Sequence, residues 1–152
     1  MKRVFLKSGL LALLLVLIYA CGAGKETAIE LSEAEKEIFN YMENDTVTIA
    51  DEDSEYEIII IDPGFNQWLR TIPKPEGYYS QNYLENRNQI LVTNWNLRAT
   101  QPFNFDPDLY LMQIDYDSQI DYGYEVNYKL YFYFVYFQRR YNQRLGPWLP
   151  RI

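Results

Sequence analysis

Histidine is absent from this 152-residue sequence, and cysteine occurs once, at position 21. A single cysteine excludes a disulfide bond within the chain. Together the two scarcities exclude a Cys/His zinc site and the Ser–His and Cys–His pairs of nucleophilic catalysis. A glycine-rich phosphate-binding loop is also missing, so the sequence gives no support to nucleotide chemistry. The length corresponds to about one domain.

The N-terminal segment has the organisation of a secretory signal. Three basic residues lie within the first seven positions, and an uncharged apolar run follows from Leu10 to Ala20. This run is shorter than the roughly 20 residues that a membrane-spanning helix needs. Residues 18–21, Ile-Tyr-Ala-Cys, resemble the lipobox of bacterial lipoproteins, whose cysteine is acylated. We therefore expect a signal peptide over residues 1–20 and a lipid anchor on Cys21.

Negative charge is concentrated directly after the expected anchor. Residues 25–57 contain twelve acidic residues and two lysines, whereas the chain beyond them contains nine acidic and nine basic residues. Like charges keep a segment extended and solvated, so we expect an acidic tether over residues 21–55. Within it, Ser32 and Glu35 have the spacing of a capping box, which predicts a short helix up to about Met42.

A globular body is expected over residues 56–146, followed by a tail over residues 147–152. Its best strand candidate is Tyr56–Asp62, which contains four isoleucines in succession. Val47–Ala50 is expected to pair with this strand. Asp62 is expected to cap the short helix that follows.

Two long amphipathic helices are expected in the body. Between Ser80 and Ala99 there is no Gly or Pro, and apolar residues recur at three- and four-residue intervals. The second segment, Tyr122–Leu145, begins with the alternation of a strand, but the helical spacing of its apolar residues continues to its end, so we interpret it as a helix. These elements predict a small α+β domain of two layers, with a short strand or hairpin and two long helices.

Between the two helices, residues 103–117 are expected to form a loop and then a short extended piece. Tyr110, Met112, Ile114 and Tyr116 alternate there with more polar positions.

Aromatic residues are dense in the last helix, where residues 122–141 contain ten of them. One interpretation is a core in which tyrosine hydroxyls reach water or amides; the other is an exposed aromatic face that binds a sugar or a protein. We favour the core. Five residues are candidates for either a binding site or a structural hub: Arg87, Trp95, Tyr124, Tyr128 and Tyr131.

Four carboxylates lie beside aromatic residues: Asp115, Asp117, Asp121 and Glu125. Paired acids of this kind are what a glycosidase requires, and the same oxygens suit calcium. We favour capping and solvation, because Asp121 suits a helix start and Glu125 has Lys129 four residues later. We assign no catalytic residue, metal site or cofactor.

Several stretches of the body resemble a family of uncharacterised lipoproteins from Bacteroidota, a domain of unknown function. They are residues 56–65 with Trp68, 77–81, 87–89, 95–96 and 120–128. The resemblance covers nearly all of residues 56–145. It implies an envelope lipoprotein domain and carries neither a mechanism nor a site.

The leading hypothesis is a non-catalytic protein-interaction domain, tethered to the cell envelope by its lipid anchor. The expected location is the outer membrane, facing the periplasm, and the expected partner is an envelope protein. Nucleic acid is not expected as a partner, because the body is neutral. The alternative is a glycan-binding module that uses stacked Tyr and Trp rings, and a carboxylate hydrolase ranks third.

Overall fold

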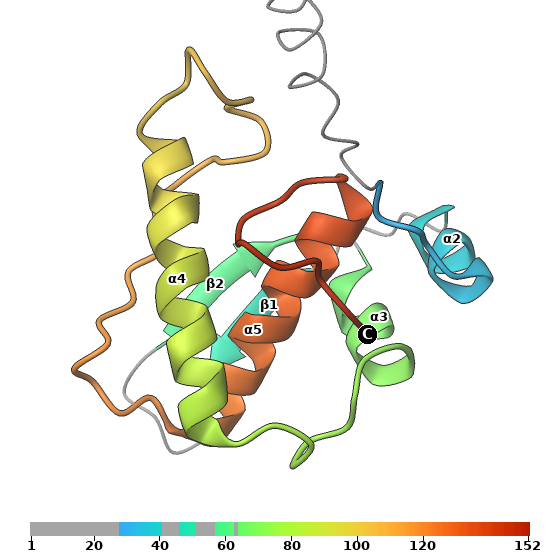
Figure 1. Cartoon of the computed structure of the whole chain (residues 1–152), viewed down its shortest axis with the longest axis horizontal. Helices are drawn as coiled ribbons and strands as arrows, with labels where there is room; N and C mark the ends of the chain where they lie inside the picture. Colours follow the sequence, from blue (N-terminus) through green and yellow to red (C-terminus); the bar gives the residue numbers. More distant parts are fainter. Residues whose placement is uncertain (1–27, 41–45, 51–56, 63) are drawn as a thin grey trace, which may run out of the picture.

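The computed structural model describes residues 28–40, 46–50, 57–62 and 64–152; for 46–50 and 57–61 it describes the backbone alone. The expected signal peptide, Cys21 and part of the expected tether lie outside the described residues. The elements, shown in Figure 1, are α2 (Glu33–Asn40), β1 (Thr46–Ala50), β2 (Glu57–Ile61), α3 (Phe65–Thr71), α4 (Gln81–Ala99) and α5 (Gly123–Arg140).

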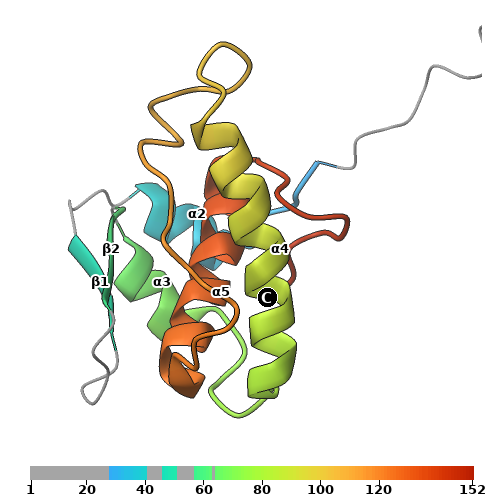
Figure 2. The same ribbon diagram turned by 90° about the vertical axis from the view of Figure 1, so that its left-hand side faces the viewer.

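Helix α5 is the centre of the body. Every residue from Leu130 to Arg139 is buried, because α4, α3 and β1 all pack against this helix. In Figure 2 the hairpin of β1 and β2 and helix α4 lie on opposite sides of α5. A helix that is apolar around its whole circumference is a buried helix, which accounts for the density of aromatic residues in this segment.

Helices α4 and α5 run parallel to each other. The Asn88 amide nitrogen donates to the Asn127 carbonyl oxygen at 2.9 Å, and the rings of Trp95 and Phe134, separated by the same 39 positions, lie 6.0 Å apart. Residues 100–122 therefore return along the body, so that α5 begins at the end of the molecule where α4 begins (Figure 1).

The prediction of a helix from Ser80 to Ala99 is confirmed. The Ser80 hydroxyl oxygen accepts the Tyr83 amide at 3.3 Å as the N-cap of α4. The helix expected over Tyr122–Leu145 is confirmed at its start, but its predicted end is wrong. Helix α5 ends at Arg140, because Asn142 adopts the left-handed conformation (φ 48°).

Strands β1 and β2 pair antiparallel, with Thr46 opposite Ile61 and Ala50 opposite Glu57. The predicted α+β class is nevertheless wrong, because this hairpin is a short ribbon at one side of the body and forms no sheet layer. The described core is built by four helices and the segments between them, so the fold is all-α. The four isoleucines predicted the local conformation of β2, but strand propensity does not determine how many strands join it.

Helix α3 is present where the sequence placed a short helix, but the predicted cap is wrong. Gly64, with φ 83°, is the N-cap residue, and Asp62 lies before it as a buried side chain. A left-handed N-cap of this kind favours glycine.

Helix α2 begins with the expected capping box. The Ser32 amide donates to Glu35 Oε2 at 2.9 Å, and the Glu35 amide donates to Ser32 Oγ at 3.3 Å. The predicted end at Met42 lies outside the described residues. Glu35 and Ile38 are buried, so this part of the expected tether packs against the body.

Candidate functional site

The tyrosines proposed as binding residues on α5 are core residues. Tyr128 and Tyr131 are buried, and the Tyr128 hydroxyl donates to the Lys74 carbonyl oxygen at 2.9 Å. The half-buried Tyr124 accepts the Gly77 amide at 2.6 Å through its hydroxyl oxygen. The structure therefore brings these three candidates together as a support for the loop before α4, and it offers no exposed tyrosine face on α5.

Arg87 and Trp95 lie apart from that cluster, and each has a structural role. The Arg87 guanidinium carbon lies 3.7 Å from the centre of the Trp148 ring and 5.0 Å from that of Tyr83. This stack fastens the C-terminal tail to α4. Trp95 is buried and donates its indole N–H to the Met112 carbonyl oxygen at 2.8 Å.

A buried ion pair, not foreseen from the sequence, joins the two ends of the described chain. Arg139 donates to both carboxylate oxygens of Glu35 and to the Glu30 and Pro150 carbonyl oxygens. Trp68 donates its indole N–H to Glu35 Oε1 at 3.2 Å. Burial alone would raise the pKa of Glu35, but the bonds from Arg139 and Ser32 outweigh burial and hold this pKa below its ordinary value.

A second buried carboxylate lies among tyrosine hydroxyls. Asp62 Oδ1 accepts from Tyr136 at 3.2 Å and from Tyr141 at 3.1 Å, and Arg140 Nε lies 4.0 Å from the same oxygen. Burial raises the pKa of Asp62 in spite of these neighbours. The hydrogen bonds and Arg140 thus do not offset the cost of burying the ionised carboxylate, although they fix the position of its oxygens.

The carboxylates considered for catalysis or calcium binding are dispersed. Asp121 accepts from Gln81 Nε2 at 2.8 Å and from the Gly123 amide at 3.0 Å, and Glu125 pairs with Lys129. Within the described ranges, no cluster of three or more Cys, Asp or Glu residues is arranged to hold a metal ion. These contacts match the capping and solvation that we favoured.

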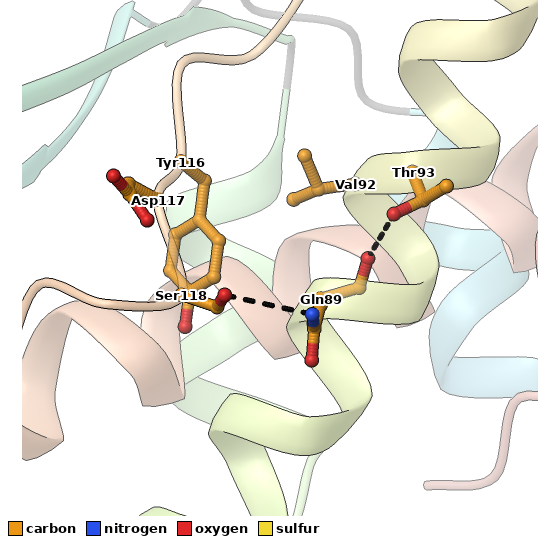
Figure 3. A pocket seen from close by; sticks show the side chains of 6 residues that line it. All are labelled: Gln89, Val92, Thr93, Tyr116, Asp117 and Ser118. Atoms are coloured by element: carbon orange, nitrogen blue, oxygen red, sulfur yellow. Dashed lines mark hydrogen bonds between the residues drawn. The ribbon is translucent and has the colours of Figure 1, made fainter.

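One polar cleft of about 270 Å³ lies between α4 and the segment before α5. Its lining residues are Gln89, Val92, Thr93, Tyr116, Asp117 and Ser118 (Figure 3). Figure 3 shows Tyr116 and Val92 on opposite sides of the cleft, with Gln89 Nε2 donating to Ser118 Oγ across a long 3.5 Å. Such a weak bond is easily exchanged for one to a ligand.

The lining residue Tyr116 belongs to a hydrogen-bond network with two buried amide side chains, Asn127 and Asn88. The Tyr116 hydroxyl donates to Asn127 Oδ1 at 2.7 Å, and burial raises the pKa of Tyr116 to about 12, so the hydroxyl stays protonated at neutral pH. Asn88 is fully buried, and its Oδ1 has no hydrogen-bond partner among the described residues. An orphaned buried oxygen is costly and is unusual in a packed core.

Four large apolar side chains are exposed at the end of α4 and on the loop that follows. Phe103 is fully exposed, and Leu97, Leu111 and Met112 are 52%, 74% and 65% exposed. We name these four residues the apolar end. Sequence reasoning did not single them out, because exposure of an apolar residue on a loop depends on what the tertiary fold places over it.

The class of the protein follows from its fold, and its family follows from the similarity of its sequence to a known family. The fold defines an all-α domain with a buried aromatic helix, and no helix in the described part of the chain is both long and apolar enough to cross a membrane. The chain belongs to a family of unknown function, DUF6146, which it matches over residues 10–148. The expected membership of an uncharacterised family is thereby confirmed. No curated protein and no solved structure matches the chain.

Proposed function

We propose that this protein is a lipid-anchored, non-catalytic domain of the bacterial cell envelope that binds a protein partner through the apolar end. The anchor is Cys21, in the lipobox-like sequence that follows the apolar N-terminal run. The resemblance to lipoproteins of Bacteroidota supports the cell envelope as the location, and the absence of acidic residues from positions 22–24 favours the periplasmic face of the outer membrane.

The exposure of the apolar end carries the partner proposal. Four large apolar side chains exposed on one helix end and the loop after it are a candidate surface for a protein or membrane contact. Each Å² of apolar surface that a partner covers contributes on the order of 25 cal/mol before the entropic costs of association. Phe103 and Met112 are of the residue types that are enriched at the cores of interfaces.

The contacts of the acidic residues support a non-catalytic role. Glycosidase chemistry requires one protonated and one ionised carboxyl facing the same bond. Asp121 and Glu125 are instead bonded to Gln81 and Lys129, and Asp62 is sealed in the core with three tyrosines near it.

A photo-crosslinking experiment in intact cells tests the partner proposal. A benzophenone amino acid replaces Phe103 in one strain and Tyr78, which is 61% exposed at the other end of α4, in a control strain. We expect a discrete protein adduct from position 103 and none from position 78. Adducts to lipid alone at position 103, or the same protein adducts at both positions, would contradict the proposal.

Metabolic labelling tests the anchor separately. Labelled palmitate is expected in the wild-type protein and not in the Cys21→Ser variant. Incorporation into neither form would overturn the lipid anchor without bearing on the partner surface.

The polar cleft favours glycan binding as a second candidate function. Its amide, hydroxyl and carboxylate groups suit a sugar. The rings first considered for this purpose pack on one another instead, as with Tyr124 and Tyr128, whose centroids lie 6.1 Å apart. Calorimetric titration with peptidoglycan fragments and capsule sugars is the test. Binding that Gln89→Ala abolishes would support this candidate, and no heat from any of them would contradict it.

A further inference from the structure

We propose that the partner contributes an extended strand that pairs with residues 113–115, an inference that rests on the proposed function. This segment runs without a turn or bend. In an extended chain, the N–H and C=O of one residue point to the same side, and those of the next residue point to the opposite side. The backbone hydrogen-bond partners of the even-numbered residues therefore define one edge of the segment, and those of the odd-numbered residues define the other.

One edge is already occupied by side chains of α4. The Ile114 amide donates to Asn96 Oδ1 at 2.8 Å, and Asn96 Nδ2 donates to the Ile114 carbonyl oxygen at 2.9 Å. Two residues earlier, the Met112 carbonyl oxygen accepts from Trp95 at 2.8 Å. Asn96 thus makes the pair of hydrogen bonds that a neighbouring strand would make. The backbone N–H and C=O of Ile114 and the C=O of Met112 therefore face α4.

The opposite edge is open at Gln113 and Asp115. It ends at Asp117, whose amide donates to the Tyr122 hydroxyl at 2.9 Å and whose carbonyl oxygen accepts from the Ile120 amide at 3.1 Å. Gln113 and Asp115 are exposed, and their backbone N–H and C=O groups make no hydrogen bond to any other described residue. The fold therefore presents two free pairs of backbone N–H and C=O groups, those of Gln113 and Asp115, on one side of the segment. An edge of this kind is the template that strand addition uses in peptide recognition.

The surroundings of the open edge define the chemistry of the incoming strand. Leu111 and Met112 of the apolar end precede the segment, so a partner strand places an apolar side chain there. Asp115 is exposed on the segment itself and Asp117 just beyond it, which favours a lysine or arginine in the partner. The occupant is therefore an extended polypeptide with an apolar residue at one end and a basic residue within it.

Selection of peptides by the full mature chain in detergent micelles tests this inference. The probe is a displayed library of random 12-residue peptides, and the selected peptides are titrated against two variants at one position. Asp115→Pro removes an N–H that is free in this structure and blocks ladder pairing, whereas Asp115→Asn keeps the backbone. We expect roughly tenfold or greater loss of affinity for Asp115→Pro relative to Asp115→Asn, because the proline removes one backbone hydrogen bond and its ring obstructs the incoming strand.

Amide hydrogen exchange provides the structural readout and confirms that both variants remain folded. In the free chain we expect slow exchange at Ile114 and fast exchange at Gln113 and Asp115. Bound peptide should slow both fast amides. Equal affinity for the two variants, fast exchange at both amides in the complex, or a library that yields no binder would each overturn strand addition. The crosslink from position 103 decides the proposed function independently of these outcomes.

Discussion

Helix α5 and the apolar end differ in the exposure of their apolar side chains. The helix carries eight of the 26 aromatic residues of the sequence, yet it is buried from Leu130 to Arg139. The apolar end has one aromatic residue and three aliphatic ones in an unremarkable stretch, yet Phe103 is fully exposed. Aromatic density thus identifies the core of this small domain, whereas the binding surface that we propose lies where apolar residues are exposed on the end of α4 and the following loop.

Truncating one phenylalanine from each region gives the largest expected contrast. Phe137 is buried against the rings of Trp95 and Tyr110, at 4.7 and 5.5 Å between centroids. We expect Phe137→Ala to lower the free energy of unfolding by roughly 3–5 kcal/mol, whereas Phe103→Ala should change it by no more than about 0.5 kcal/mol. Urea denaturation of both variants is the measurement, and similar losses would remove the distinction between the two regions.

Removing Arg139 tests whether α2 belongs to the same folded unit as α5. The substitution Arg139→Met leaves the Glu35 carboxylate buried without its cation and is expected to cost about 3 kcal/mol. The matched control is Arg70→Met, at an exposed arginine of α3. The double variant Glu35→Met/Arg139→Met should recover part of the loss, because the uncompensated charge is then absent. A loss below about 0.5 kcal/mol for Arg139→Met would contradict the docking of α2.

The buried tyrosines predict a loss of stability at alkaline pH. Burial raises the pKa of Tyr116 and Tyr128 to about 12, while unfolded tyrosines ionise near the ordinary value of 10. Between these values the unfolded state releases protons that the native state retains, so stability falls as pH rises, by up to about 1.4 kcal/mol per pKa unit for each tyrosine. Unfolding free energies at pH 9, 10, 11 and 12 provide the check. Constant stability across this range would indicate exposed hydroxyls on α5.

The titration of Asp62 is expected to change the free energy of unfolding the least, and the direction of that change with pH is defined. Because its folded-state pKa is raised, the native state holds the proton more tightly than the unfolded state, and stability falls as pH rises through that pKa. Glu35, with a lowered pKa, acts in the opposite direction and loses stability as pH falls through its folded-state pKa. Subtracting the profile of Asp62→Asn from that of the wild type isolates the first contribution. A difference that grows more favourable with rising pH would refute it.

Local signals in the sequence were sufficient to place α4 and the start of α2, but they did not give the end of α5 or the cap of α3. The absence of Gly and Pro between Ser80 and Ala99, together with the spacing of the apolar residues, predicted α4. The capping box at Ser32 likewise specified the start of α2. Such features act within one turn of helix, so they can be recognised without knowledge of the tertiary structure.

The buried ion pair and the edge that we propose for strand addition depend on contacts that no local pattern encodes. Glu35 and Arg139 pair across 104 positions, and Asn96 holds Ile114 across 18. The alternation from Tyr110 to Tyr116 predicted an extended piece, but it did not reveal that α4 occupies one of its edges. The buried partner of Glu35 also escaped notice, because its acidic neighbours indicated a solvated segment.

Hydroxyl-radical footprinting of the folded chain, with mass-spectrometric quantification at each residue, tests the contrast between α5 and the apolar end most directly. Phe103 and Met112 are expected to oxidise at rates close to those in the urea-unfolded chain, after the intrinsic reactivity of each side chain is allowed for. Tyr131, Tyr133 and Tyr136 are expected to be strongly protected. Protection of Phe103 and Met112 together with rapid oxidation of the α5 tyrosines would contradict the account.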